Sequence, residues 1–217
     1  MKGDIILLEK HHRKAAKMIV SKIGADIKNS KTRFTISIAG ESGSGKSEMA
    51  AAIAEELLKQ EITSYVFGQD DYFNLPPKSN DAKRRVDPDW LGPHMEVDLE
   101  TLEKNLISAK HGENIINKPE VDYDNNSIGR MSVDLTGVKV LIAEGTYTSL
   151  LKNIDRKIFI TANRLETLAH RKKRNRGNEV GDPFIEHILG TEHKIIAGHK
   201  FLADFIISKD FDVEVVE

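Results

Sequence analysis

Gly40-Glu41-Ser42-Gly43-Ser44-Gly45-Lys46-Ser47 satisfies every fixed position of the pattern G-x-x-x-x-G-K-S, in which a glycine-rich loop cradles phosphate groups. An apolar, β-branched run at 34–39 precedes this phosphate loop and predicts a buried strand. Strong helix formers follow at 48–59, with apolar side chains at helical spacing. A strand, the loop and a helix in this order predict a nucleoside triphosphate site rather than a plain glycine-rich turn.

Each part of the phosphate loop has an expected role. The glycines allow backbone conformations in which successive N–H groups converge on phosphate oxygens, and the helix N-terminus adds partial positive charge. Lys46 is expected to reach the β- and γ-phosphates, and the Ser47 hydroxyl to take one Mg²⁺ position. The expected ligands of the loop are a nucleoside triphosphate and Mg²⁺. The expected nucleotide-binding residues of this stretch are Gly40, Ser42, Gly43, Ser44, Gly45, Lys46, Ser47 and Glu48.

The composition bounds the class of protein. A chain of 217 residues predicts one α/β domain over 1–217, with 1–30 as an N-terminal helical extension. The net charge of -2 implies no general attraction to nucleic acid or to an anionic membrane. The chain has no cysteine, which excludes disulfides and thiolate sites. No apolar run has the length of a bilayer span or a signal peptide, so we expect a cytoplasmic protein. The sequence leaves open whether the chain forms a homo-oligomer.

The rest of the sequence alternates between strand-like and helix-like segments. This alternation predicts a mainly parallel sheet with helices on both faces and ligands at the carboxyl ends of its strands. The expected elements are a helix at 5–29, a strand at 64–68, a long irregular loop at 74–93, a helix capped by Asp98 to about 109, a small β excursion at 114–136, strands at 138–143, 157–160 and 203–207, and a cationic helix at 164–175.

Acidic residues fall at two of these strand ends. Asp70 directly follows the strand at 64–68, where it is suited to accept a proton from a substrate hydroxyl. Asp71 remains its competitor, because the sequence does not say which carboxylate faces inward. Glu144 ends the apolar strand at 138–143, where a carboxylate helps to hold Mg²⁺ or its waters.

A cationic run at 170–176 is the second electropositive feature. Arg171 and Arg174 are three apart and share one face of a helix, from which they could close on the β- and γ-phosphates. Gly177 and Gly181 then allow a hinge, so we expect a helical lid at about 163–181. The alternatives are a solvated face or a patch that binds polyanions.

With these pieces placed, the chain resembles the uridine kinase and phosphoribulokinase branch of P-loop kinases over roughly 33–207. The phosphate loop looks like the family's G-x-S-G-S-G-K-[ST]. Residues 69–73 are similar to its Q-D-S-F-Y element, and residues 141–145 are similar to its strand that ends in E-G. Residues 200–207 look like its closing K-K-Y-A-D-L-I-I run. The resemblance implies a P-loop kinase fold, a catalytic Asp70 and a Mg²⁺ role for Glu144. It also places Arg171, Arg174 and Arg176 on the phosphates.

The departures from the family pattern lie in the acceptor region. No aspartate immediately follows the aromatic Trp90, although uridine and cytidine kinases carry a ribose-binding aspartate directly after an aromatic residue there. Val121 and Asn126 stand where those kinases place a tyrosine and a histidine on the base. The lid is also shorter than usual. We expect the acceptor pocket to draw on 71–95 and 119–130. Its candidate residues are Asp71, Tyr72, Trp90, Asp122, Tyr123 and Arg130.

The sequence therefore predicts an ATP- and Mg²⁺-dependent kinase of a hydroxyl on a small metabolite, with Lys46, Asp70, Arg171 and Arg174 as catalytic residues. A pyrimidine nucleoside is the leading acceptor by resemblance, and a sugar, glycerate or pantothenate is the alternative. A nucleotide-dependent switch is a rival, although the chain has no N-K-x-D guanine signature. The net charge and the single basic segment oppose a polynucleotide-end kinase.

Overall fold

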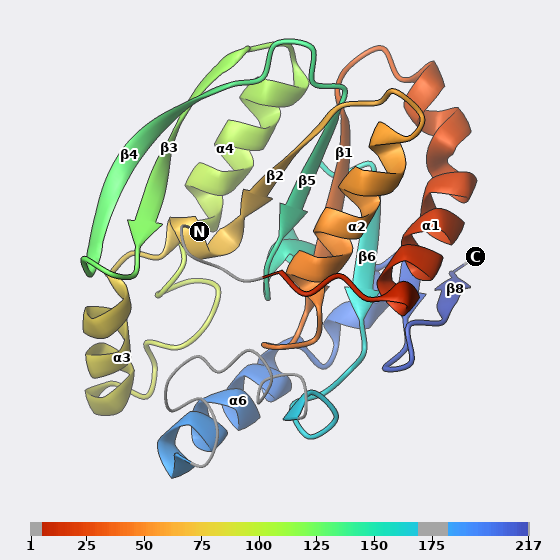
Figure 1. Cartoon of the computed structure of the whole chain (residues 1–217). Helices are drawn as coiled ribbons and strands as arrows, with labels where there is room; N and C mark the ends of the chain where they lie inside the picture. Colours follow the sequence, from red (N-terminus) through yellow and green to blue (C-terminus); the bar gives the residue numbers. More distant parts are fainter. Residues whose placement is uncertain (1–5, 169–181, 217) are drawn as a thin grey trace.

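The computed structural model describes residues 6–168 and 182–216, which a six-stranded sheet organises (Figure 1). The strand order is β2-β5-β1-β6-β7-β8, in which β8 runs antiparallel to β7 and the other pairs are parallel. This arrangement confirms the predicted mainly parallel sheet. The strands are β1 Phe34–Gly40, β2 Ser64–Gly68, β5 Val140–Glu144, β6 Arg156–Ile160, β7 Phe205–Ile207 and β8 Val213–Val215.

Helices cover both faces of the sheet because alternate residues of the central strands are apolar on each side. Ile36 of β1 and Ile142 of β5 pack under α1 and α2 on one face. Ala39 and Leu141 face the other way, toward the core that α4 covers. The helices are α1 Lys10–Asn29, α2 Lys46–Leu58, α3 Pro77–Val86, α4 Leu99–Lys110 and α6 Pro183–Ile196, with short 3-10 turns η1 Gln69–Tyr72, η2 Thr148–Leu150 and η3 His199–Leu202.

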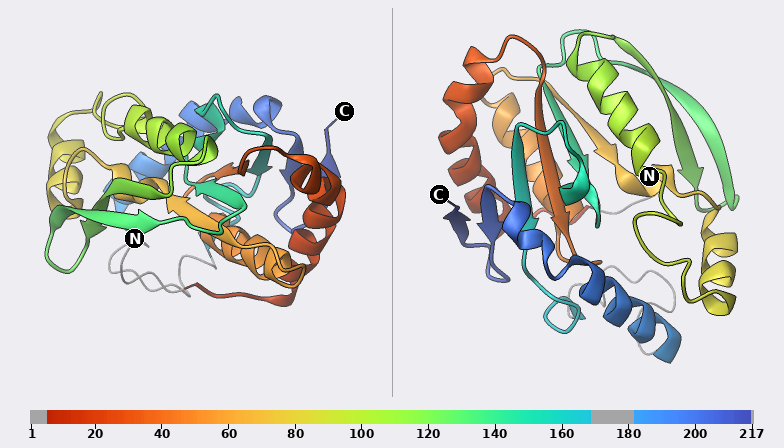
Figure 2. Two further views of the ribbon diagram at one scale, coloured as in Figure 1. Left: turned by 90° about the horizontal axis from the view of Figure 1, so that it is seen from above. Right: turned by 180° about the vertical axis from the view of Figure 1, so that it is seen from behind.

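The predicted β excursion is an antiparallel hairpin of β3 Ile115–Asp122 and β4 Ser127–Asp134. It lies beside α4, outside the β2 edge of the sheet, while α3 and α6 lie toward the carboxyl ends of the parallel strands (Figures 1 and 2). The hairpin also packs against η1, the turn that directly follows β2. These elements surround the end of the sheet where the phosphate loop emerges.

Two expectations for the helices were wrong. Helix α1 begins at Lys10 rather than at residue 5, because Glu9 and His12 form a reciprocal capping box there. The stretch 74–93 is not wholly irregular, because it contains α3. Pro77 marks the first turn of this helix, where the missing proline N–H costs nothing. Asp98 does cap α4 as expected, since its side chain accepts the Thr101 N–H at 2.9 Å.

The C-terminal part of the chain adds α6 and β8, which the sequence did not predict. Residues 164–167 form turns, and the rest of the expected helix at 164–175 lies outside the described residues. The boundaries of a single domain and of a lid stay predictions. In the described ranges, no helix is both long and apolar enough to cross a membrane.

Asp155 joins the starts of β1 and β6 to the C-terminal end of α4. Its carboxylate accepts the Thr35 N–H at 2.8 Å, the Thr35 hydroxyl at 2.9 Å and the Lys110 ammonium at 2.7 Å. Burial alone would raise the pKa of Asp155, but the hydrogen bonds from Lys110 and Thr35 outweigh it and lower the pKa. This carboxylate therefore fastens β1 to the end of α4 and to the start of β6.

We expect Asp155→Asn to lower the free energy of unfolding at neutral pH by about 1–2 kcal/mol, a value reduced for partial solvent exposure. Because the fold lowers the pKa of Asp155, its stabilisation is complete above the unfolded value and is lost as the pH falls through the folded one. The difference between the two proteins should therefore shrink below about pH 4. Urea unfolding across pH measures this, and a difference that stays constant into the acid range would contradict it.

Candidate active site

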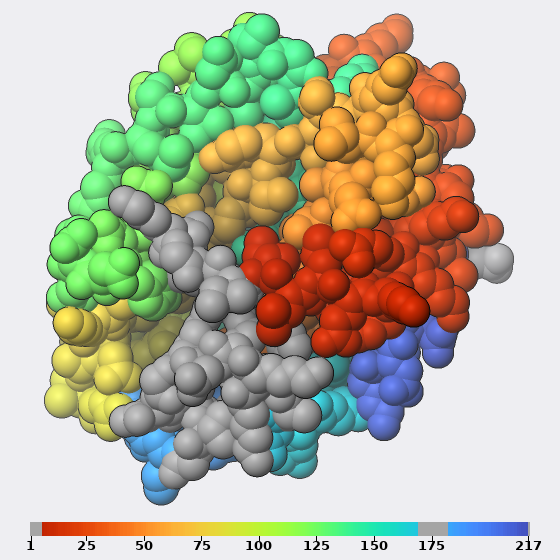
Figure 3. All heavy atoms as spheres, viewed as in Figure 1, coloured from red at the N-terminus to blue at the C-terminus, as the bar shows by residue number. Residues whose placement is uncertain are grey.

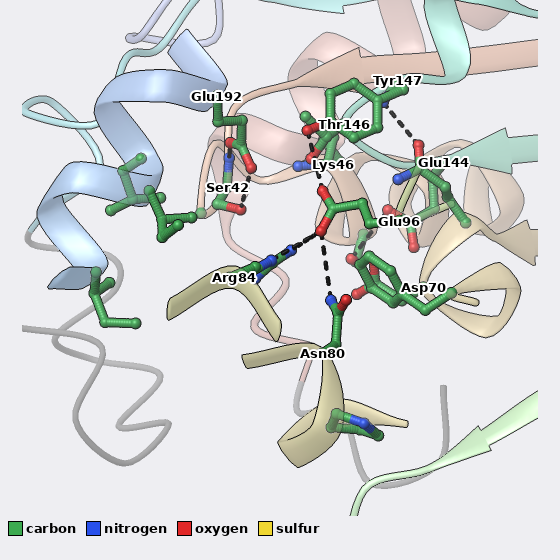
Figure 4. Close-up of a pocket in the computed structure, with 18 of the residues that line it drawn as sticks. Ser42, Lys46, Asp70, Asn80, Arg84, Glu96, Glu144, Thr146, Tyr147 and Glu192 are labelled. Atoms are coloured by element: carbon green, nitrogen blue, oxygen red, sulfur yellow. Dashed lines mark hydrogen bonds and ion pairs between the residues drawn. The ribbon is translucent and has the colours of Figure 1, made fainter. Parts of the chain in front are cut away.

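A pocket of about 270 Å³ opens at the carboxyl ends of β1, β2 and β5 (Figure 4). The phosphate loop contributes Ser42, Gly43, Lys46 and Ser47 to its lining. The residues after β2 add Asp70, β5 ends in Glu144, and α3 and α6 supply the remaining sides. This is the edge of a parallel sheet where ligands are expected to bind.

The phosphate loop needs glycine at two of its turns. Gly40 has φ +155°, and a Cβ there would lie 2.8 Å from the Ile160 carbonyl oxygen. Gly45 has φ +93° and caps α2 in the left-handed conformation, which other residues rarely adopt. The following residues therefore point their backbone N–H groups out of the helix N-terminus, as an anion site requires.

The predicted catalytic and metal-binding side chains that the structure describes meet in this pocket. The Lys46 ammonium donates to the Glu41 carbonyl oxygen at 2.8 Å. The Ser47 hydroxyl donates to the Glu144 carboxylate at 3.3 Å, and Asp70 lines the same space. A hydroxyl and carboxylates are hard oxygen ligands of the kind that Mg²⁺ prefers. The residues present therefore fit a Mg²⁺ ion between Ser47 and Glu144.

A carboxyl group of the chain itself, that of Glu192, is hydrogen-bonded to the phosphate loop. Glu192 of α6 accepts the Ser42 N–H at 2.7 Å and the Ser42 hydroxyl at 3.2 Å (Figure 4). Burial raises the pKa of Glu192 above its ordinary value, although the nearby Lys46 charge opposes that shift. The Glu192 carboxyl group therefore occupies hydrogen-bond donors of the phosphate loop, and we expect a nucleotide phosphate that uses the same donors to compete with it.

A second contact fastens α6 to the loop. The Glu41 carboxylate lies 2.5 Å from His193 Nδ1 and accepts the Arg164 N–H at 2.6 Å. Glu41 is 6% exposed, whereas the His193 side chain is 48% exposed, so the contact lies at the edge of the buried region. This contact joins α6 to the phosphate loop. The α6 side chains that line the pocket are Ile185, Ile188, Leu189 and Glu192.

A buried polar network forms the side of the pocket opposite the loop (Figure 4). Glu96 is 1% exposed and accepts the Arg84 Nε–H at 2.8 Å, with a second Arg84 nitrogen at 2.7 Å. It also accepts hydrogen bonds from the Asn80 amide, the Tyr147 hydroxyl and the Gly92 N–H. Since both carboxylate oxygens are engaged, Glu96 holds Arg84 and Asn80 of α3 in place along the pocket.

Two of the predicted acceptor residues lie at or next to this network. Tyr123 lines the pocket itself. The Trp90 indole N–H donates to the Asn80 amide oxygen at 2.6 Å, so Trp90 orients Asn80. Asn126, which replaces the expected histidine, accepts the Lys78 N–H at 2.8 Å and joins the hairpin turn to the first turn of α3.

Other predicted acceptor residues lie away from the pocket. Asp71 is buried in a pair with Lys118 at 2.6 Å and accepts the Val121 N–H, so it anchors the hairpin. Tyr72 is 1% exposed, and its hydroxyl accepts the Asn105 amide at 3.0 Å within the α4 core. Val121 is also fully buried.

Two further candidates belong to the hairpin. Asp122 accepts hydrogen bonds from the backbone and side chain of Asn125 within the turn. Arg130 lies exposed on β4. The predicted lid residues Arg171, Arg174 and Arg176 lie outside the described residues. Of the predicted loop residues, Ser44 lines a separate pocket, and Glu48 is buried in the first turn of α2.

Sequence reasoning missed the residues on α3 and α6. Both helices begin with residues that are typical of a helix N-terminus. Pro77 is the first residue of α3, and Asp182 caps α6 just before Pro183. The apolar side chains of α6 also follow helical spacing. These signals could have predicted the two helices from the sequence. The contact between Glu96 and Arg84 could not be predicted in this way, because it depends on how α3 packs in the folded protein.

Three comparisons place the chain among known proteins. Residues 35–182 match the model of the Phosphoribulokinase / Uridine kinase family. Uridine kinase of Ureaplasma parvum is 31% identical over 200 residues, which cover 79% of this chain and 95% of that protein. The bifunctional alpha-galactosidase/sucrose kinase of Mediterraneibacter gnavus is 29% identical over 196 residues, or 85% of this chain but 21% of that much longer protein. D-glycerate 3-kinase of Cryptococcus neoformans shares the fold with a TM-score of 0.64 at 12% identity, covering 96% of this chain and 100% of that one.

The Glu192 contact predicts how the loop responds to an anion. We expect Glu192→Gln to bind inorganic tripolyphosphate about fivefold or more tightly, because the competing charge is removed from a partly dry site. Since burial raises the pKa of Glu192, the wild-type carboxylate becomes neutral at a higher pH than an ordinary glutamate. The gap between the two proteins should therefore close as the pH falls.

Isothermal titration calorimetry from pH 8 to pH 5 measures both effects. The matched control is Glu100→Gln, which removes an exposed carboxylate of α4 that pairs with Lys104. Equal affinities of the wild type and Glu192→Gln at pH 8 would contradict the competition.

Proposed function

Because this chain belongs to the phosphoribulokinase/uridine kinase family, we propose that it transfers the γ-phosphate of ATP to a hydroxyl group of an uncharged, polyhydroxylated small molecule, with a sugar as the first candidate. The observation that carries the proposal is the shared pocket. Asp70 lines the same space as Lys46 and Ser47 of the phosphate loop, and α3 supplies polar side chains opposite them.

In the proposed mechanism, Asp70 accepts the proton of the acceptor hydroxyl as it attacks the γ-phosphate. Lys46 and the N–H groups of the phosphate loop hold the β- and γ-phosphates and stabilise the charge that develops on them. Mg²⁺ held near Ser47 and Glu144 would neutralise phosphate charge. Asp71 is unsuited to the base role, since it is buried against Lys118. Arg171, Arg174 and Arg176 stay proposed phosphate contacts.

The charges of the pocket favour a neutral acceptor. Among the described residues that line it, two cations, Lys46 and Arg84, stand beside the carboxylates of Asp70, Glu96, Glu144 and Glu192. The Arg84 charge is already matched by Glu96 at 2.7 Å, and Lys46 belongs to the nucleotide's side. A carboxylate or phosphate on the acceptor would therefore meet no unmatched cation in this part of the chain. This argues against glycerate, pantothenate and sugar phosphates.

The polar groups of α3 favour a sugar. Arg84 and Asn80 present N–H groups along the pocket, and a site of fixed hydrogen-bonding groups selects acceptors with matching hydroxyls. The similarity to the sucrose kinase supports the same class.

A pyrimidine nucleoside is the second candidate, favoured by the uridine kinase of Ureaplasma parvum. The burial of Val121 and the structural role of Asn126 weigh against it, because neither position offers the base a hydrogen bond as the resembled kinases do.

An acceptor panel tests this proposal directly. We expect ADP release with Mg-ATP to rise with one or more neutral sugars, among sucrose, glucose and fructose, and not with glycerate, pantothenate or ribulose 5-phosphate. Asp70→Asn should lower kcat by about 10²–10⁴-fold while ATP still binds, because the proton acceptor is lost. Asp81→Asn on the exposed side of α3 is the control.

The other outcomes are informative. Stimulation of ADP release by uridine or cytidine would show that the acceptor is a nucleoside rather than a sugar. Stimulation by an anionic acceptor would contradict the argument from charge. ATP binding without stimulation by any acceptor would favour the nucleotide-dependent switch.

A conservative change in α3 tests the acceptor side of the pocket separately. We expect Arg84→Lys to raise the KM of the acceptor about tenfold and to leave the KM of ATP nearly unchanged. Lysine keeps the charge that pairs with Glu96 but loses the planar, forked set of donors. Steady-state kinetics with each substrate varied in turn measures this. The control is Arg85→Lys on the neighbouring exposed position, and an equal rise in both KM values would count against an acceptor role.

A further inference from the structure

The turn η1 presents one side chain to the active-site pocket and buries the two on either side of it. Asp70 lines the pocket together with Lys46, whereas Gln69 and Asp71 are 1% and 4% exposed. Because the internal hydrogen bonds of a 3-10 turn are weaker than those of an α-helix, contacts with other elements must set the orientation of η1. The direction of the Asp70 carboxylate therefore depends on what holds its neighbours.

Two of these contacts join η1 to the sheet and to α4. The Gln69 side-chain oxygen accepts the Tyr147 N–H at 2.7 Å, in the segment after β5. The Tyr72 hydroxyl accepts the Asn105 amide of α4 at 3.0 Å. Both are uncharged hydrogen bonds, so they hold the two ends of the turn without adding charge beside Asp70.

The third contact is an ion pair with the hairpin. Lys118 of β3 donates to the Asp71 carboxylate at 2.6 Å and to the Pro119 carbonyl oxygen at 3.1 Å. The Asp71 carboxylate also accepts the Val121 N–H at 3.2 Å. The Lys118 and Asp71 side chains are 3% and 6% exposed, so water screens neither charge well. Removal of either partner would leave an unbalanced charge in the interior, which is strongly unfavourable.

Asp71 brings a second carboxylate to the position next to Asp70. The Q-D-S-F-Y element that this segment resembles has a serine there. A charged neighbour that turned into the pocket would repel the phosphates of the nucleotide and compete with Asp70 as the base. The Lys118 ammonium instead holds this carboxylate against the hairpin.

Asp71 has room to move if the pair is broken. Together with Asp70 it lines a further pocket, of about 340 Å³, whose other walls include Ala50 of α2, Tyr65 of β2 and Met131 of β4. This pocket lies on the face shown in Figure 3, between the green hairpin and the orange α2. Because an unbalanced buried charge is costly, we expect an unpaired Asp71 to turn toward this space.

We propose that Lys118 is a positioning residue that determines which of the two adjacent aspartates faces the phosphates. By holding Asp71 on the hairpin, Lys118 keeps η1 in the orientation that directs Asp70 toward the acceptor. This step rests on the proposed function, in which Asp70 takes the proton of the acceptor hydroxyl. Lys118 acts through Asp71 rather than on a substrate, because it is buried and its ammonium is bound to Asp71 and Pro119.

Steady-state kinetics of charge-removal variants tests this role. Lys118→Met should lower kcat about 10–100-fold and leave both KM values within about threefold, because a misplaced base slows the chemistry while the binding groups stay. The double variant of Lys118→Met with Asp71→Ser removes both charges. It should restore kcat to within about threefold of the wild type, since no unbalanced charge remains. Asp71→Ser alone leaves the Lys118 charge unpaired and should also lower kcat.

The matched control is Val133→Ala, which removes a buried side chain from β4 of the same hairpin and leaves the ion pair intact. Thermal unfolding confirms that each variant is folded, and Val133→Ala should lower the melting temperature without lowering kcat. A loss of kcat in Val133→Ala equal to that in Lys118→Met would overturn the proposal. So would a rise in KM alone, or a double variant that is no faster than the single ones.

Hydrogen exchange tests the placement of η1 without any acceptor. Mass spectrometry of a peptide that covers 69–73 should show exchange about tenfold or more faster in Lys118→Met than in the wild type or in Val133→Ala. The double variant should exchange like the wild type, and unchanged exchange in Lys118→Met would contradict the positioning role. A wild type that transfers phosphate to no acceptor would instead count against the proposed function alone.

Discussion

The register of the parallel strands is the constraint on which the rest of the site depends. Ile38 of β1 pairs with Glu144 of β5, and Gly68 of β2 pairs with the same Glu144. Gly40 pairs with Ile160 of β6. Because parallel pairing keeps the carboxyl ends level, the phosphate loop, the residues after β2 and the end of β5 emerge at one edge. A slip of one residue would turn Ile36 and Ile142 out of the core, so the burial of these side chains fixes the geometry of the site.

Electrostatics divides the pocket into two parts. On the loop side, Lys46 and the N–H groups of the helix N-terminus favour an anion. The Glu192 carboxyl group accepts a hydrogen bond from the Ser42 N–H there. On the α3 side, Arg84 is neutralised by Glu96, and what remains is a set of hydrogen-bonding groups. A buried ion pair of this kind contributes little net stability, since desolvation offsets the attraction between its charges. Its contribution here is to orient Arg84 and Asn80.

Local sequence patterns predicted the elements around the phosphate loop well and the elements on the α3 side of the pocket poorly. The phosphate loop, β2 and the Asp98 cap depend on residues close together in the chain, and the structure places these elements as expected. The neighbours Asp70 and Asp71 could not be separated, because η1 turns one toward the pocket and the other toward Lys118. The partners of Glu96 come from α3, the loop after it and the residues after β5, and no local pattern predicts that meeting.

Helix α6 contacts both halves of the site at once. Glu192 and His193 hold it to the loop. One turn away, Ile188 and Leu189 line the same pocket as Arg84 of α3. If a phosphate displaces Glu192, as we expect, α6 loses one of its contacts with the loop, and the position of Ile188 and Leu189 is then free to change. Thermodynamic linkage requires this influence to be mutual, so that each substrate alters the affinity for the other by the same factor. Binding of the two substrates would then be coupled through α6.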